Sequence, residues 1–145
     1  MLRLAKRSVC VALVCVMAGC ATSDEASGAP KRSASTPEDS PLESWAALFQ
    51  KNDIAGLSAM YSDAFKSQTL ENKAAVAAWL KEGDARGQWK GSIADTSEAR
   101  RLPKGNRESD GPVRISGPFG SADVYLEFVR EDGAWRVTQM TMQQY

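Results

Sequence analysis

The spacing of apolar residues divides the chain into four stretches with different expected structures. An apolar run of nine residues, Val9 to Met17, is followed by a polar stretch, residues 21–39, without leucine, isoleucine, valine or aromatic side chains. From Pro41 onward apolar positions recur with a period near 3.6, and after Gly87 the period changes to 2. The pattern predicts an apolar leader, a flexible linker, a group of helices and then a β-sheet.

The first helix is predicted from its cap and its apolar spacing. Pro41 suits the first position of a helix, and Asp39 or Ser40 can cap it. The apolar residues that follow recur at i, i+3, i+4 and i+7. They are Leu42, Trp45, Ala46 and Phe49. One face of this helix is therefore apolar.

Two further helices are expected. Asn52-Asp53 interrupts the first helix, and Asp53 can cap a second helix with three apolar residues on one side. These are Ile54, Leu57 and Tyr61. Residues 61–65 then leave the helix toward a short strand or turn. A third helix is predicted from about Leu70 to Glu82, ending at Gly83. Its buried side is predicted to be Val76, Trp79 and Leu80.

Alternating polar and apolar residues after Gly87 predict strands. Residues 89–93 have the pattern of a half-buried strand, with Trp89 and Ile93 on the apolar side. Residues 95–111 are polar, and we expect a ragged strand over residues 99–102 followed by an exposed loop. The alternation resumes before a turn at residues 117–120. The residues that resume it are Val113 and Ile115.

The C-terminal hairpin is the most specific structural signal in the sequence. Asp132-Gly133 is a two-residue turn of the primed type between two alternating strands. Such a turn sets which residues face each other across the hairpin. The expected pairs are Phe128 with Val137, and Arg130 with Trp135, the second having the composition of a cation–π contact.

Farther from the turn, the apolar parity of the last strand switches to Met140 and Met142. One extra residue near Thr138-Gln139 would restore a continuous apolar face. It would set Leu126 against Met140 and Val124 against Met142. The sequence therefore predicts a β-bulge and a strongly bent hairpin.

A bent antiparallel sheet covered by three preceding helices resembles the nuclear-transport-factor-2-like, or ketosteroid-isomerase-like, superfamily. The resemblance covers residues 41–145 and depends on three segments, residues 45–53, 61–65 and 128–137. It implies an α+β fold, a cone-like arrangement in which three helices pack on the concave face of a curved antiparallel sheet. The superfamily includes isomerases, cyclases, dehydratases and binding proteins, so the fold alone does not set the function.

The N-terminal residues have the order of a secretory signal, with basic side chains before the apolar run and small residues after it. The nine-residue run is shorter than the roughly 20 residues of a membrane-spanning helix. Residues 16–20 resemble the lipobox of bacterial lipoproteins, in which the cysteine is acylated and begins the mature chain. We therefore expect a signal peptide at 1–19, lipidated Cys20 with a flexible linker at 20–40, and one domain at 41–145.

This resemblance also implies a location. Ala21, rather than an aspartate, follows the cysteine, which in the lipoprotein family directs the protein to the outer membrane, facing the periplasm. Met17 replaces the more usual leucine of the lipobox. Each of these predictions has an alternative. The alternative to lipidation is an ordinary signal peptide in which Cys20 is incidental. The alternative to a flexible linker is a partner-binding peptide.

Composition excludes several classes of chemistry. The chain has no histidine, which removes the commonest general base and the commonest zinc ligand. Cys10 and Cys15 lie in the leader, so only Cys20 remains after cleavage and no internal disulfide can form. Without the leader, the chain has 15 basic and 18 acidic side chains, which gives no electrostatic case for nucleic acid. We expect no cofactor and no metal.

Candidate site residues follow from the expected cone. Enzymes of the superfamily use a carboxylate inside the cone, but Asp123 and Glu127 have the outward parity in the hairpin. Tyr61 with Asp63 is the remaining carboxylate–phenol pair, although a turn aspartate and a core tyrosine are the simpler interpretation. Five rings are expected over the hollow sheet, as ligand-pocket walls or, more simply, as core. They are Trp45, Tyr61, Phe65, Trp79 and Trp89.

The outer face of the sheet is the third candidate. It is defined here by Tyr125, Glu127, Val129, Arg136 and Thr138, and it could pair with a second copy or an envelope protein. A basic cluster at residues 100–107 suggests an anion site, but the acidic residues among it favour a solvated hairpin tip. We therefore expect a lipid-anchored, non-catalytic domain that binds a small molecule or another protein. The alternative is an isomerase- or cyclase-type enzyme using an Asp–Tyr pair.

Overall fold

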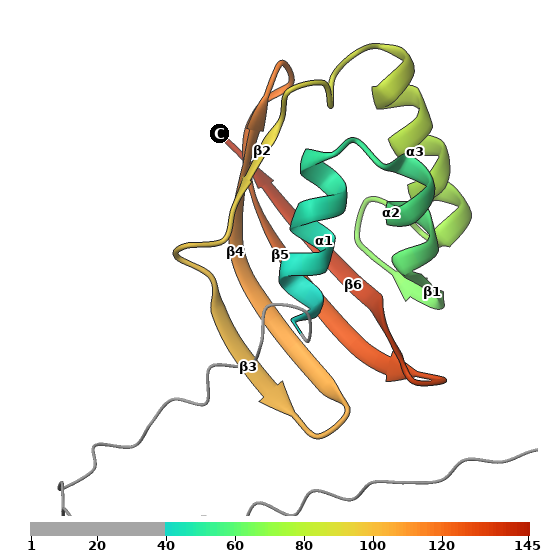
Figure 1. Cartoon of the computed structure of the whole chain (residues 1–145). Helices are drawn as coiled ribbons and strands as arrows, with labels where there is room; N and C mark the ends of the chain where they lie inside the picture. Colours follow the sequence, from blue (N-terminus) through green and yellow to red (C-terminus); the bar gives the residue numbers. More distant parts are fainter. Residues whose placement is uncertain (1–39) are drawn as a thin grey trace, which may run out of the picture. The chain divides into compact units, whose positions relative to one another are not determined.

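The computed structural model describes residues 40–145, which form one sheet and three helices (Figure 1). The predicted signal peptide, Cys20 and almost all of the linker lie outside the described residues. The helices are α1 (Pro41–Gln50), α2 (Ile54–Met60) and α3 (Lys73–Ala85). The strands are β1 (Tyr61–Lys66), β2 (Ile93–Asp95), β3 (Arg100–Lys104), β4 (Arg107–Gly117), β5 (Gly120–Glu131) and β6 (Ala134–Gln144).

The sheet has the strand order β1-β6-β5-β4-β2, and β3 pairs with the other half of β4. All neighbours are antiparallel except β1 and β6, which run parallel. The helices lie together on one face of this curved sheet, and α1 crosses in front of its middle strands (Figure 1). The α+β architecture predicted from the sequence, three helices on the concave face, is confirmed.

Each helix begins at a side-chain cap, which satisfies a backbone N–H that has no partner within the helix. Ser40 Oγ accepts from the Glu43 N–H at 3.4 Å, and Asp53 Oδ1 accepts from the Gly56 N–H at 2.8 Å. Asn72 Oδ1 caps α3 by accepting from the Ala75 N–H at 3.0 Å. The first two caps are those the sequence predicts.

The predicted hairpin register is confirmed, including its bulge. Phe128 faces Val137 and Arg130 faces Trp135, with the Arg130 guanidinium 6.0 Å from the ring centroid. The register shifts at the next pair, where Thr138 is the extra residue. Beyond it, Leu126 faces Met140 and Val124 faces Met142. The bulge therefore keeps the methionines on the concave face.

The third helix differs from its prediction at both ends. It starts at Lys73 rather than near Leu70, because Asn72 provides the cap. It also continues through Gly83 to Ala85. Gly83 is buried against the Trp89 indole, and a Cβ there would lie 2.1 Å from ring atom Cε2. The glycine makes room for a ring and does not end the helix.

The prediction of a strand over residues 89–93 is wrong in extent and parity. Strand β2 covers only Ile93–Asp95, with Ala94 buried and Ile93 exposed. Trp89 is held outside the sheet, because its Nε1 donates to the Leu80 carbonyl of α3 at 2.8 Å. Residues 95–111 also contain more strand than expected, since β3 and the start of β4 form a regular hairpin.

No helix within residues 40–145 is long and apolar enough to cross a membrane.

We expect Gly83→Ala to destabilise the domain by roughly 1–3 kcal/mol, because the added methyl would overlap the Trp89 ring. At an unobstructed helix position the same substitution would stabilise the domain, because alanine is a better helix former than glycine. A loss of stability would therefore indicate the contact with Trp89. Urea unfolding followed by tryptophan fluorescence measures the change. Lys81→Ala, at an exposed position of the same helix, is the control and should be near neutral. Equal stability of Gly83→Ala and the unmodified chain would contradict the packing.

Candidate functional site

The concave face of the sheet is filled by aromatic side chains. Trp45 stacks on Phe49, with ring centroids 5.4 Å apart, and Phe49 lies 6.0 Å from Trp89. Trp89 in turn contacts Trp79 at 4.8 Å and Phe119 at 5.4 Å. Such edge and stacked contacts are typical of a packed core. Four of the five predicted pocket rings are buried in this way. These are Trp45, Tyr61, Phe65 and Trp89.

Tyr61 and Asp63 do not meet, so the predicted carboxylate–phenol pair is not assembled. The Tyr61 hydroxyl is buried, accepts from Trp45 Nε1 at 3.3 Å and donates to Met140 Sδ at 3.5 Å. Burial raises the pKa of this phenol to about 12, although the Trp45 bond opposes the shift. The Asp63 side chain is 96% exposed and pairs with Lys73 Nζ at 3.0 Å. Regular alternation would place these two residues on one side of β1, but the pairing of β1 with β6 is irregular between Tyr61 and Lys66, and along this stretch Asp63 is exposed while Tyr61 is buried.

Trp79 is the one predicted pocket residue that borders a hollow. The hollow has a volume of about 430 Å³ and lies between α3, the loop before it and the end of β6. Its walls are both apolar and polar: Thr69, Leu70, Trp79, Met142 and Gln144. It is open to solvent at the edge of the core, where a flat apolar group could contact the indole.

The outer face carries two further hollows. One, of about 330 Å³, is lined by residues that include Leu102, Tyr125 and Thr141. The other, of about 540 Å³, lies beside it over β5, β6 and the loop after β1. Tyr125 lies over Gly111, where a Cβ would come within 2.8 Å of the Tyr125 ring and where φ is +147°. Glycine at this position therefore shapes the first hollow.

The predicted outer-face residues differ in how free they are. Tyr125 and Glu127 are exposed, and Val129 is half-buried. The Arg136 guanidinium donates to the Ala59 carbonyl at 2.7 Å, so this side chain is committed to the last turn of α2. Thr138 donates to the Glu127 carbonyl at 3.3 Å at the bulge. Asp123 has the outward parity but is buried beneath Arg114 and Tyr145, which both donate to it.

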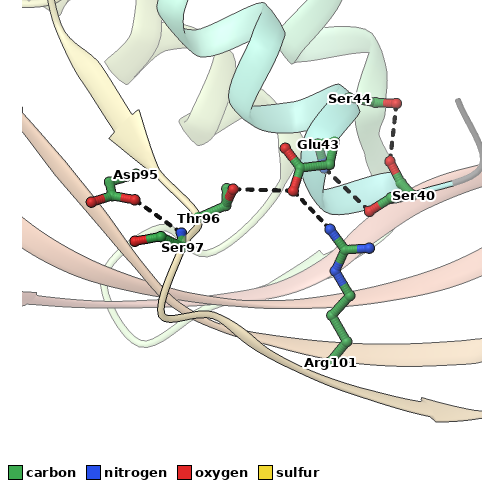
Figure 2. Close-up of polar contacts among 7 residues, drawn as sticks. All are labelled: Ser40, Glu43, Ser44, Asp95, Thr96, Ser97 and Arg101. Carbon is green, nitrogen blue, oxygen red and sulfur yellow. Dashed lines mark hydrogen bonds and ion pairs between the residues drawn. The ribbon is translucent and has the colours of Figure 1, made fainter. Parts of the chain in front are cut away.

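A polar junction joins the start of α1 to β3 (Figure 2). One carboxylate oxygen of Glu43 accepts from Arg101 Nη2 at 2.7 Å and from Thr96 Oγ1 at 3.0 Å. In Figure 2 the Arg101 side chain extends from its strand toward the first turn of the helix. This junction connects α1 to the edge of the sheet.

Asp110 lies beside this junction and is the one strongly perturbed carboxyl of the described residues. It faces Arg101 on β3 and Leu126 on β5 in the strand register, and the residue is 3% exposed. Neither carboxyl oxygen has a hydrogen-bond partner within residues 40–145. Burial, followed by the neighbouring Glu108, raises the Asp110 pKa to about 8, against a smaller opposing effect of Arg101. The carboxyl therefore keeps its proton to a higher pH than an exposed aspartate does.

Asp110 could not be found by the reasoning that located the other candidates. Its segment, residues 95–111, is polar throughout, and the sequence pattern there predicts a loop. What identifies Asp110 is its place in the sheet. The pairing of β3 with β4 puts position 110 on the concave side. The described residues contain no cluster of three or more side chains arranged to hold a metal.

The stability of the domain should fall as the pH rises from about 4 to about 8. In this range the unfolded Asp110 has lost its proton, whereas the folded one keeps it, so unfolding releases a proton. Asp110→Asn mimics the protonated acid. It should be more stable than the unmodified chain above pH 8, because the amide occupies the same buried position without the negative charge whose burial is unfavourable.

Urea unfolding at about pH 5, 7 and 9 measures this difference. Asp123→Asn is the contrasting control, because hydrogen bonds from Tyr145 and Arg114 lower the Asp123 pKa. That variant should lose stability at neutral pH. Parallel pH curves for Asp110→Asn and the unmodified chain would contradict a protonated Asp110.

Comparisons with known proteins give structural likeness only. No family model matches the chain, and no curated protein matches it significantly. The structure is similar to an NTF2-like protein of unknown function from Pseudomonas putida, with a TM-score of 0.60 and 17% identity over 70% of this chain and 80% of that one.

Two other solved structures are similar at lower identity. A protein of unknown function with a cystatin-like fold from Nostoc punctiforme has a TM-score of 0.57 and 11% identity, over 72% of this chain and 85% of that one. Bd1075 of Bdellovibrio bacteriovorus has a TM-score of 0.62 and 11% identity, over 72% of this chain but only 39% of that one. Together with the strand order and helical layer, these likenesses show that residues 40–145 have the nuclear-transport-factor-2-like fold.

Proposed function

We propose that this chain is a lipid-anchored lipoprotein of the bacterial outer membrane, facing the periplasm, whose domain is a non-catalytic interaction module. The observation that carries the proposal is the contrast between the two faces of the sheet. The concave face, where enzymes of this fold do their chemistry, is packed with buried rings. The outer face keeps exposed apolar side chains and two hollows. The anchor is supported by the lipobox resemblance that ends at Cys20.

The outer face has the composition of a modest interface. Leu102 is 66% exposed and Tyr125 is 39% exposed, and both line the same hollow. Tyrosine is enriched at protein interfaces because its ring contributes apolar area and its hydroxyl can still bond to water. Gln139 and Thr141 supply polar groups around the two apolar residues. A protein partner therefore fits this surface better than a membrane does.

Charge favours a second copy of the chain as that partner. Arg100 and Glu127 line one hollow, and Arg107 and Glu127 line the other. The ion pairs formed within residues 40–145 include none of these three side chains. In a twofold dimer the same surface of both copies is in contact, related by a 180° rotation. The arginines of one copy can therefore face Glu127 of its partner. The proposed interaction is therefore self-association through the outer face.

The Trp79 hollow supports a second candidate, the binding of a small apolar ligand. Its volume of about 430 Å³ lies within the range of small-molecule sites, and Leu70 and Met142 complete an apolar wall. Mass spectrometry of small molecules that copurify with the domain tests this candidate directly. A ligand that is lost from Trp79→Ala but retained by Trp135→Ala would support it.

The chain from residue 21 onward should sediment as a dimer at tens of micromolar, roughly tenfold above a dissociation constant near 1 µM. Tyr125→Glu should make it monomeric, because it places a charge at the centre of the contact. Ala78→Glu adds the same charge at an exposed position of α3 and should leave the dimer intact. A monomer before any substitution would reject self-association and leave another envelope protein as the partner.

Cys20 should carry a diacylglyceryl group at the start of the mature chain. In a bacterial host, mass spectrometry of the N-terminal peptide should show the lipid mass, and the protein should fractionate with the outer membrane. Cys20→Ser should lose both the mass and the membrane association. An unmodified thiol on a cleaved or uncleaved chain would contradict the anchor without affecting the fold.

A further inference from the structure

The carboxyl of Asp110 lies among charged groups from three elements. Glu108 on β4 lies two residues away on the same side of the strand, so both carboxyls have the concave orientation. Arg101 is the residue opposite Asp110 on β3, and Glu43 contributes the carboxylate of α1. β5 contributes the apolar side chains of Leu126 and Phe128. Three carboxyls and one guanidinium are therefore brought to this part of the sheet, and the ion pair formed there joins Arg101 to Glu43.

The present arrangement of that guanidinium depends on a neutral Asp110. Arg101 Nη2 donates to Glu43 at 2.7 Å, while both Asp110 oxygens remain without a partner. An ionised, buried carboxylate is strongly unfavourable unless it is paired. Arg101 is the cation that faces Asp110 on β3. An ionised Asp110 would therefore attract the Arg101 guanidinium and compete with Glu43 for it.

Loss of that contact would have a local effect. β3 lies at the edge of the sheet, all five of its residues are exposed, and its strand pairing is with β4 alone. The contact of Arg101 with Glu43 is the ion pair that joins β3 to α1. Thr96, in the loop before β3, donates to the same carboxylate oxygen of Glu43. Without Arg101, that carboxylate would no longer be held in place, and the Thr96 bond would weaken.

We propose that Asp110 acts as a proton-dependent latch between α1 and the β3–β4 hairpin. While its carboxyl holds a proton, Arg101 stays on Glu43 and the hairpin is fixed to the helix. When that proton is lost, Arg101 turns toward Asp110 and the hairpin loosens. The latch goes beyond the proposed self-association and does not depend on it.

The test measures hydrogen exchange of the full chain as a function of pH. Protection factors, which correct for intrinsic exchange, are compared at about pH 6 and about pH 9.5 for the amides of residues 100–102 and 104, since Pro103 has no N–H. We expect a loss of protection of roughly fivefold or less, the change that corresponds to the loss of one partly exposed ion pair, Arg101 with Glu43. Central residues of β5 are the internal reference and should not change.

Carbon-13 NMR of the Asp110 carboxyl supplies the second measurement. The pH midpoint of its chemical shift should coincide with the midpoint of the exchange change. Glu108→Gln should move both midpoints to lower pH, because it removes the neighbouring negative charge that opposes ionisation.

Two variants separate the latch from a simple structural role. Asp110→Asn should keep β3 protected at both pH values. Glu43→Gln should leave β3 poorly protected at both, because the charged acceptor of Arg101 is gone. Asp63→Asn, at an exposed carboxyl far from the junction, should behave as the unmodified chain. Titration of Asp110 near pH 4, or an equal loss of protection in Asp110→Asn, would overturn the proposal.

Discussion

The fold depends on one extra residue in the last strand. Thr138 interrupts the pairing of β5 with β6, and this shift keeps the apolar side chains of both halves of the hairpin on one face. Without it, Met140 and Met142 would point away from the helices. The aromatic rings of α1, the Trp89 loop and β1 all pack on the continuous surface that results. The bulge is therefore the constraint from which both the curvature and the core follow.

The filled concave face shapes the functional conclusion. In this fold the space between helices and sheet can hold a substrate, but here Trp45, Phe49 and Trp89 occupy it. Tyr61 is held by bonds to Trp45 and Met140, so its hydroxyl serves the core. The interaction proposed above therefore uses the outside of the domain, either the outer face or the open hollow beside Trp79. A membrane anchor at residue 20 would keep that outside surface near other envelope proteins.

The sequence-based predictions were most accurate where the local rules for helix caps and turns agree with the packing of the apolar residues. Ser40, Asp53 and the Asp132-Gly133 turn act through neighbouring backbone groups, so their roles are visible in sequence. The bulge was predictable because only one register keeps Leu126 and Met140 on the same face. Gly83 was misread, since the ring that requires it comes from a distant loop. Parity likewise failed at Ile93, where Trp89 bonds to α3 instead of joining a strand.

The candidate site was predictable only in part. Five rings were expected over the concave face, but a sequence pattern does not tell a pocket wall from a core residue. Asp110 escaped notice because its polarity resembles that of a loop. Its burial arises from strand pairings to Arg101 and Leu126, which are distant relationships. A polar segment can therefore hide a buried carboxyl whenever long-range pairing, and not local pattern, decides which side is covered.

The burial of the Tyr61 hydroxyl affects one side of the interior. Burial raises the Tyr61 pKa to about 12, against the opposing effect of the Trp45 bond, so the phenol resists ionisation further into the alkaline range than an exposed tyrosine does. The opposite side, with β6 and β5 in between, contains Asp110 on β4. The two buried ionisable groups thus lie on opposite sides of β6 and β5, the phenol against Trp45 of α1 and the carboxyl beside the edge strand β3. A change in the charge of Asp110 would therefore act first on the margin of the sheet, at a distance from its aromatic centre.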